Sequence, residues 1–351
     1  NYLLLSQCHL IVMEIFMSPI EIIIEYKKCL YQRNLIVSVR KIVRKSFHFD
    51  FVVLTLSYNQ PRFCLNTIWN SNATTFADQS FVDTQPFSIF VNSNNSIYVP
   101  NRRTGQILIW LNENDLNPTK TIEGNLSYPL SLFVKSNGDI YVDNGNNGRV
   151  DKWIKENETW ISVMNVTSQC YGLFIDIYDN LYCSLFDNHR VDKKWSDGTT
   201  TVVAGTGVQG SATDLLRSPH GIFVDINLDL YVADSENNRI QLFRRNQRNG
   251  TTVAGNGSAK LTIDLNTPTG VILDGDQYLF IVDCYNHRII GSDENGFRCI
   301  YGCSMNDKLS YPVTMSFDSY GNIYVTDRDN NRVQKIVKNQ VCSKFFLLLL
   351  I

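Results

Sequence analysis

Three turns of this chain place aspartate, asparagine and arginine close together. They read "DSENNR", "DCYNHR" and "DRDNNR", and each lies between two short apolar runs. Asp and Asn side chains accept hydrogen bonds from nearby backbone N–H groups, and the arginine can pair with the carboxylate. We predict that these residues hold the turns together, with partner recognition by the same loops as the alternative. They are Asp234, Asn238, Arg239, Asp283, Asn286, Arg288, Asp327, Asn331 and Arg332.

The nine cysteines include three pairs whose spacing could support disulfides. Cys170 and Cys183 bracket a predicted hairpin, and Cys299 and Cys303 enclose a tight loop. Free or buried thiols remain the alternative, because spacing alone does not fix connectivity. Zinc binding is disfavoured, since no C-x-x-C motif occurs and no histidine stands at finger spacing.

Seven N-x-[ST] sequons point to the same compartment as the cysteine pairs. Glycosylation and disulfides both belong to secreted or lumenal domains, so we expect a secreted protein or one on the extracellular side of a membrane. The candidate acceptors are Asn72, Asn94, Asn125, Asn157, Asn165, Asn249 and Asn256.

Composition favours a strand-rich globule. Of the 351 residues, 44% are hydrophobic, 12% aromatic and only 19% charged. The formal net charge is −2, but residues 1–57 hold seven Lys/Arg against four Asp/Glu, and the remainder holds 25 against 30. Such an acidic body argues against binding the phosphate backbone of a nucleic acid.

Six units with a spacing of roughly 41 to 49 residues organise the chain from Pro86 onward. They begin "PFSIFVNSNNSIYVP", "PLSLFVKSNGDIYVD", "CYGLFIDIYDNLYCS", "PHGIFVDINLDLYVA", "PTGVILDGDQYLFIV" and "PVTMSFDSYGNIYVT". Apolar residues alternate with a period of two between Gly, Asn and Asp turns, which is the pattern of strands and hairpins. Four short antiparallel strands fit each unit, and this predicts an all-β, six-bladed propeller.

The last unit lacks a fourth strand, whereas "WNSNATTFAD" (69–78) precedes the first unit without a blade of its own. We predict that this N-terminal strand completes the last blade, which would close the ring and remove two exposed edges. Ring closure would also bring Cys64 near Cys342. A disulfide there would close a loop of nearly the whole propeller.

The repeated pattern "P-x-G-[IV]-x-[VL]-D … [YF]-V-x-D-x-x-N-x-R-[IV]" resembles the NHL repeat over about residues 61–342. The resemblance implies a six-bladed propeller used mainly as a recognition platform. A minority of related propellers are metal-dependent enzymes, so an amidating lyase or lactonase is one alternative function. An intracellular recognition domain for RNA or ubiquitination substrates is another.

Histidines supply little for catalysis. His189 and His287 precede the arginine in their turns, and only His220, in "SPHGIF", could face a central channel. A catalytic zinc usually takes three protein ligands, so one histidine does not make such a site. No G-x-S-x-G elbow or phosphate-binding glycine loop occurs either, and we predict no catalytic residue, metal or cofactor.

Units that break the pattern are where we expect a partner to bind. The first unit has "NRRTGQ" and the third "SLFDNHR" in place of the regular turn. We expect a monomer whose propeller face binds a protein or small ligand. The candidate rim residues are Asn101, Arg102, Arg103, Asp187, His189 and His220.

The two ends lie outside the repeats. Residues 1–60 form an N-terminal segment in which "RKIVRK" followed by "SFHFDFVVLTLSYNQ" resembles a signal peptide or membrane anchor, with a gene-model artefact as the alternative. Residues 61–342 form the propeller. Residues 343–351 are an apolar tail, too short to span a bilayer.

Overall fold

The computed structural model describes residues 8–17, 20–31, 34–42, 56–64, 67–82, 84–259, 262–304 and 309–339. The chain separates into two compact units, residues 1–57 and 58–351. In the first unit, strand β2 (Ile20–Tyr31) pairs antiparallel with β1 (Cys8–Met17) and with β3 (Asn34–Ile42). The signal-like sequence falls mostly on residues 43–55, outside the described residues.

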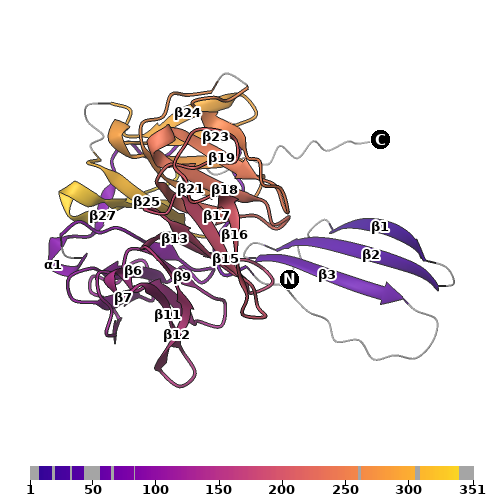
Figure 1. The fold of residues 1–351 in the computed structure, drawn as a ribbon, viewed down its shortest axis with the longest axis horizontal. Helices are drawn as coiled ribbons and strands as arrows, with labels where there is room; N and C mark the ends of the chain where they lie inside the picture. The colour runs from indigo at the N-terminus through magenta and orange to yellow at the C-terminus, as the bar shows by residue number, and fades with distance from the viewer. Residues whose placement is uncertain are drawn as a thin grey trace, which may run out of the picture. The chain divides into compact units, whose positions relative to one another are not determined.

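The second unit is a propeller of six four-stranded antiparallel sheets, numbered here as blades 1 to 6 in chain order (Figure 1). Blade 1 consists of β5 (Phe90–Val91), β6 (Ile97–Asn101), β7 (Gln106–Trp110) and β8 (Lys120–Glu123). Blade 2 consists of β9 (Leu132–Val134), β10 (Ile140–Asp143), β11 (Arg149–Ile154) and β12 (Thr159–Asn165). Blade 3 consists of β13 (Cys170–Ile175), β14 (Leu181–Leu185), β15 (Arg190–Lys194) and β16 (Thr200–Gly205).

The remaining blades repeat this order. Blade 4 consists of β17 (Pro219–Val224), β18 (Leu230–Asp234), β19 (Arg239–Phe243) and β20 (Thr251–Gly255). Blade 5 consists of β21 (Pro268–Leu273), β22 (Leu279–Asp283), β23 (Arg288–Asp293) and β24 (Gly296–Tyr301). Blade 6 consists of β25 (Pro312–Phe317), β26 (Ile323–Asp327), β27 (Arg332–Ile336) and β4 (Thr74–Ala77). Short helices are α1 (Gln79–Val82), η1 (Gly145–Asn147), η2 (Ser235–Asn237), η3 (Cys284–Asn286) and η4 (Arg328–Asn330).

Strand β4 closes the ring, as the sequence predicted. Its residues pair antiparallel with β27, and α1, which follows β4, lies beside β27 (Figure 1). Phe76 of β4 packs between Trp110 of blade 1 and Tyr324 of blade 6, with 5.3 Å between ring centroids in both contacts. The N-terminal strand therefore joins the first blade to the last and leaves no edge strand open between them.

Each blade runs outward from the propeller axis as a meander, so its turns lie alternately on two faces. Turns between the second and third strands, together with the segments that lead into the first strands, form what we call the arginine face. Turns between the first and second strands form the plugged face. The arginine face carries the turn arginines Arg239, Arg288 and Arg332, and residues 58–63 lie across the plugged face.

Candidate functional site

The predicted Asp–Arg turns are buried hydrogen-bond clusters on the arginine face. The Asp234 carboxylate accepts hydrogen bonds from the Arg217 backbone N–H at 2.6 Å and from Arg239 Nε at 2.7 Å. Asp283 and Asp327 accept the equivalent pair of bonds in blades 5 and 6, within 2.6–2.8 Å. Each carboxylate therefore ties its own turn to the segment that leads into the same blade.

A second contact links neighbouring blades. Asn238 has a left-handed backbone conformation with φ 55°, and its Oδ1 accepts the Thr267 N–H at 2.8 Å. Asn331, with φ 53°, accepts the Gln85 N–H at 2.9 Å and thereby joins blade 6 to blade 1. The donors precede the first strand of the next blade, so these asparagines fix the blade-to-blade connection.

Two histidines make the same link. His189 Nδ1 accepts the Ser218 N–H and His287 Nδ1 accepts the Tyr311 N–H, both at 3.1 Å. His189, a rim candidate, therefore has a structural hydrogen bond. Asn286, the residue before His287, has a different role: its side chain donates a hydrogen bond to the Asp283 carboxylate at 2.9 Å.

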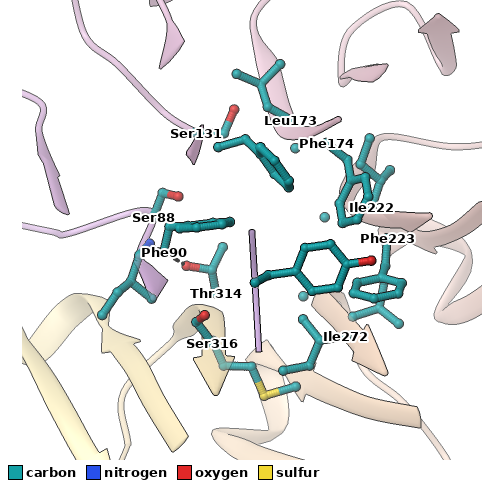
Figure 2. Close-up of a pocket in the computed structure, with 18 of the residues that line it drawn as sticks. Ser88, Phe90, Ser131, Leu173, Phe174, Ile222, Phe223, Ile272, Thr314 and Ser316 are labelled. Atoms are coloured by element: carbon teal, nitrogen blue, oxygen red, sulfur yellow. Dashed lines mark hydrogen bonds between the residues drawn. The ribbon is translucent and has the colours of Figure 1, made fainter. Parts of the chain in front are cut away.

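The innermost strands surround an axial channel that contains a cavity of about 100 Å³ (Figure 2). The fifth residue of four consecutive units is phenylalanine: Phe90, Phe133, Phe174 and Phe223. Neighbouring rings along this series stand 5.0 Å apart between centroids. The third residue of every unit is small, Gly, Ser or Thr, which leaves the space in the channel.

Tyr58 closes one end of this channel. Its ring lies 5.4 Å from both Phe174 and Phe223 and 6.3 Å from Phe133. Burial, together with the carboxylates of Asp225 and Asp176, raises the pKa of its phenol, which stays protonated. No sequence signal indicated this residue, because it precedes the repeats.

Residues after Tyr58 continue across the plugged face. Asn59 Nδ2 donates to the backbone carbonyls of Asn92 at 2.8 Å and Phe317 at 3.1 Å, in blades 1 and 6. Farther along, Arg62 pairs with Asp276 of blade 5 at 3.3 Å, and the Phe63 ring packs 5.3 Å from that of Phe317. The chain itself therefore covers this end of the axis.

The second residues of the six units close the other end of the channel. Phe87 of blade 1 stacks on His220 of blade 4 at 5.3 Å, and Tyr171 of blade 3 approaches His220 edge-on at 4.8 Å. Leu130 and Val313 are buried in the same cluster as Phe87. Aromatic and aliphatic groups thus fill the axis at the arginine face.

His220 is an uncharged, buried member of this cluster. Its side chain is 5% exposed, and burial lowers its pKa to about 3. Its Nδ1 has no hydrogen-bond partner among the described residues. The sequence placed His220 at the channel, and the structure shows it closing one end.

Arg102 lies against two aromatic rings, and the charge of Arg328 acts on both Tyr171 and His220. We refer to Arg102, Tyr128, Tyr171, Phe186, Arg328 and His220 as the axial cluster. The Arg102 guanidinium stands 5.0 Å from the Phe87 ring and 4.7 Å from the Tyr128 ring, while Phe186 stacks on Tyr171 at 4.3 Å. Arg102 was a rim candidate. Arg328 was missed, although it occupies the same repeat position as Arg102.

The other rim candidates have different surroundings. Asn101 Oδ1 accepts the backbone N–H groups of Arg103 and Thr104, both at 3.2 Å, so Asn101 shapes its own turn. Arg103 is exposed in that turn. Asp187 is exposed, and its charge contributes to the raised pKa of Tyr171, which burial raises most.

Two of the predicted cysteine pairs are disulfides: Cys170–Cys183, with 5.2 Å between Cα atoms, and Cys299–Cys303, with 6.0 Å. The first pair is not directly opposite in register, because Cys170 faces Leu185 and Cys183 faces Leu173. Cys64 is disulfide-bonded, but its predicted partner Cys342 lies outside the described residues. All seven sequon asparagines are exposed.

Among the described ranges, no group of three His, Cys, Asp or Glu side chains is placed to hold a metal ion. Helices in the described part of the chain also lack the length and apolar character needed to cross a bilayer.

Solved structures with a similar fold include binding proteins and enzymes. Virginiamycin B lyase from Staphylococcus aureus is 15% identical, with a TM-score of 0.56, over 78% of this chain and 89% of that one. An auxiliary nutrient binding protein from Bacteroides thetaiotaomicron is 15% identical, with a TM-score of 0.57, over 88% and 84%. A putative gluconolactonase is 13% identical, with a TM-score of 0.57, over 81% and 98%. At these identities the likeness shows the fold alone.

The sequence itself matches one family model, NHL repeat, at residues 216–243 and 309–336, and it matches none of the curated proteins with which it was compared. These matches are the fourth and sixth units, each from just before the first strand to the end of the third. Four further blades with the same strand order complete the ring. The chain therefore carries NHL repeats at its fourth and sixth units, within a six-bladed β-propeller.

Proposed function

We propose that this propeller is a non-catalytic binding module, on the extracytoplasmic side, that recognises a small molecule or protein at the axial cluster of its arginine face. One observation carries the proposal. Residues 58–63 of the chain itself cover the axis on the plugged face, whereas the axial cluster on the other face keeps polar atoms that have no partner among the described residues. A ligand would supply those partners.

The compartment follows from different residues. Disulfide-bonded cysteines and seven exposed sequon asparagines suit an oxidising, glycosylating environment. They support an extracytoplasmic location independently of what the axial cluster binds.

A matched pair of tyrosine variants tests the binding face. Tyr128 on the arginine face is 45% exposed, and Tyr320 on the plugged face is 51% exposed. We would measure retention of a panel of soluble metabolites and short peptides by equilibrium dialysis and mass spectrometry. The proposal predicts that Tyr128→Ala loses compounds that the unmodified protein retains, because Tyr128 stacks on Arg102, and that Tyr320→Ala keeps them.

The reverse pattern, with losses in Tyr320→Ala alone, would place binding on the plugged face. Chemical conversion of a panel compound by the purified protein would show that the module is catalytic. Either outcome would overturn the proposal.

A further inference from the structure

One repeat position on the arginine face carries a side chain in five of the six blades. This position directly follows the Asp, or the residue equivalent to it, in the turn between the second and third strands of a blade. In chain order it is occupied by Arg102, Gly145, Phe186, Ser235, Cys284 and Arg328. Ser235 and Cys284 are only 1% and 2% exposed, so the position faces inward. Arg102 belongs to blade 1 and Arg328 to blade 6, and these two blades are neighbours because the ring closes between them.

Arg102 is a desolvated cation with no counterion among the described residues. Its Nε is buried without a hydrogen-bond partner, and its guanidinium lies between two aromatic rings. Burial lowers its pKa, and the positive charge of Arg328 lowers it further. The turn arginines differ: Arg239, for example, is 7% exposed and is bonded to Asp234 at 2.7 Å.

The positive charge of Arg328 is only partly compensated by a nearby carboxylate. Its Nε lies 3.1 Å from the Asp329 carboxylate, an ion pair whose side chains are about one-third exposed, yet this buried Nε has no well-formed hydrogen bond. Its charge also acts on His220 and Cys284, whose pKa values are shifted mainly by burial. Two further carboxylates act on the cluster: exposed Asp187 and buried Asp143 both raise the pKa of Tyr171, which burial raises most.

Two neighbouring cations with buried, unpartnered donors are costly unless an anion joins them. Guanidinium groups suit oxyanions particularly well, because their planar set of donors matches a carboxylate or phosphate in a bidentate arrangement. Beneath them, His220 Nδ1 is a further unpartnered polar atom in a side chain that is more than nine-tenths buried.

We propose that Arg102 and Arg328 form an oxyanion site that binds a carboxylate or phosphate group of the ligand, with Tyr128 covering the bound group. The inference rests on the proposed function and names the chemistry of the ligand. The anionic group neutralises the arginine pair, and an attached planar group contacts the exposed part of the Tyr128 ring.

The test uses phenyl phosphate, benzoate and uncharged benzamide, with inorganic phosphate as the probe that lacks a ring. Affinities are measured by isothermal titration calorimetry on the full chain at constant ionic strength. We expect phenyl phosphate or benzoate to bind at least tenfold more tightly than benzamide, and to weaken as sodium chloride rises. Which of the two binds more tightly identifies the phosphate or the carboxylate as the preferred group.

Variants that remove one positive charge test which arginines bind the anion. Arg102→Gln and Arg328→Gln should each weaken binding of the anion at least tenfold, since a hydrogen bond to a charged group is lost. Arg244→Gln is the matched control, because Arg244 pairs with Asp229 on the plugged face at 2.8 Å. The Arg244→Gln variant should bind the anion with the same affinity as the unmodified protein. Arg102→Lys keeps the charge without the planar donors and should give an intermediate affinity.

Equal binding by the unmodified protein, Arg102→Gln and Arg328→Gln would overturn the inference and identify an adventitious anion only. So would equal affinity for benzoate and benzamide, or no binding of any charged probe at millimolar concentration. The proposed function fails separately, through the Tyr128→Ala and Tyr320→Ala comparison. Tyr128-dependent retention of neutral compounds alone would leave the function standing and refute the oxyanion site.

Discussion

Individual residues on the arginine face divide into those with complete hydrogen bonding and those without it. Asp234 has three partners, Arg217, Asn237 and Arg239, and is fully buried. Arg102 contacts two aromatic rings and has no carboxylate partner in the part of the chain that the structure describes. Repetition of the first arrangement across blades marks it as structural, whereas Arg102 stands in the first unit, which departs from the pattern.

Removing the Asp234 carboxylate tests the structural assignment. Asp234→Ala leaves the Arg239 charge buried without its ion pair, so we expect a loss of about 3–5 kcal/mol in the free energy of unfolding. Glu236→Ala in the same turn is the control, because Glu236 and Arg217 pair with both side chains more than 40% exposed. That change should cost less than about 1 kcal/mol in urea denaturation. Equal losses in the two variants would contradict the assignment.

His220 makes stability depend on pH. Its pKa is lowered to about 3 in the folded protein, against roughly 6.5 when unfolded, so the unfolded chain binds the proton first as pH falls. Stability from this group is complete above pH 6.5 and declines below it. Relative to His220→Phe, the unmodified protein should lose about 2 kcal/mol of unfolding free energy between pH 7.5 and pH 5. A constant difference between the two proteins at both pH values would show that His220 is not buried uncharged.

The sequence predicted the residues of the repeated turns but not all of their roles. Spacing was sufficient for Asp234 and Arg239, because a local turn brings them together whatever the rest of the fold does. Arg328 was not singled out, since its closeness to Arg102 becomes visible only when the six units are placed around one axis.

Among the structural elements, the six sheets and the closing strand β4 match the prediction. Period-two alternation and turn residues act locally, so they identify strands well. The three-stranded sheet of β1 to β3 was not expected, because the segment has no repeat and its apolar runs resembled targeting sequences. The position of the segment around Tyr58 could not be predicted either, because it depends on contacts with blades that are distant in the sequence.

Replacing Tyr58 tests whether this segment seals the channel. Tyr58→Ala removes a ring that contacts Phe174 and Phe223, so we expect a lower melting temperature and a larger apolar cavity. Apolar cavities of that kind bind small aromatic molecules. Millimolar phenol should therefore raise the melting temperature of Tyr58→Ala and leave the unmodified protein unchanged.

Tyr178→Ala serves as the control, because Tyr178 is 58% exposed on the same face. If phenol raised the melting temperature of all three proteins alike, Tyr58 would not be filling the channel.

The whole molecule combines a closed axis with an exposed, sequon-bearing surface. Expression through a secretory pathway should add N-glycans at some of the seven exposed asparagines, and peptide N-glycosidase should remove the added mass. Asn117 is an internal control, because it is exposed but precedes proline in "NPT", which prevents modification. A secreted protein without glycans, or with a glycan at Asn117, would remove the sequons as support for the compartment.

The central claim is that ligands bind at the axis of the arginine face. Hydrogen–deuterium exchange tests it most directly, measured without ligand and with whichever of phenyl phosphate and benzoate binds more tightly. We predict slower exchange in the turns at residues 101–105 and 327–331, which carry Arg102 and Arg328. Turns of the plugged face, residues 176–180 and 274–278, should exchange at an unchanged rate. Protection confined to those plugged-face turns would contradict the account.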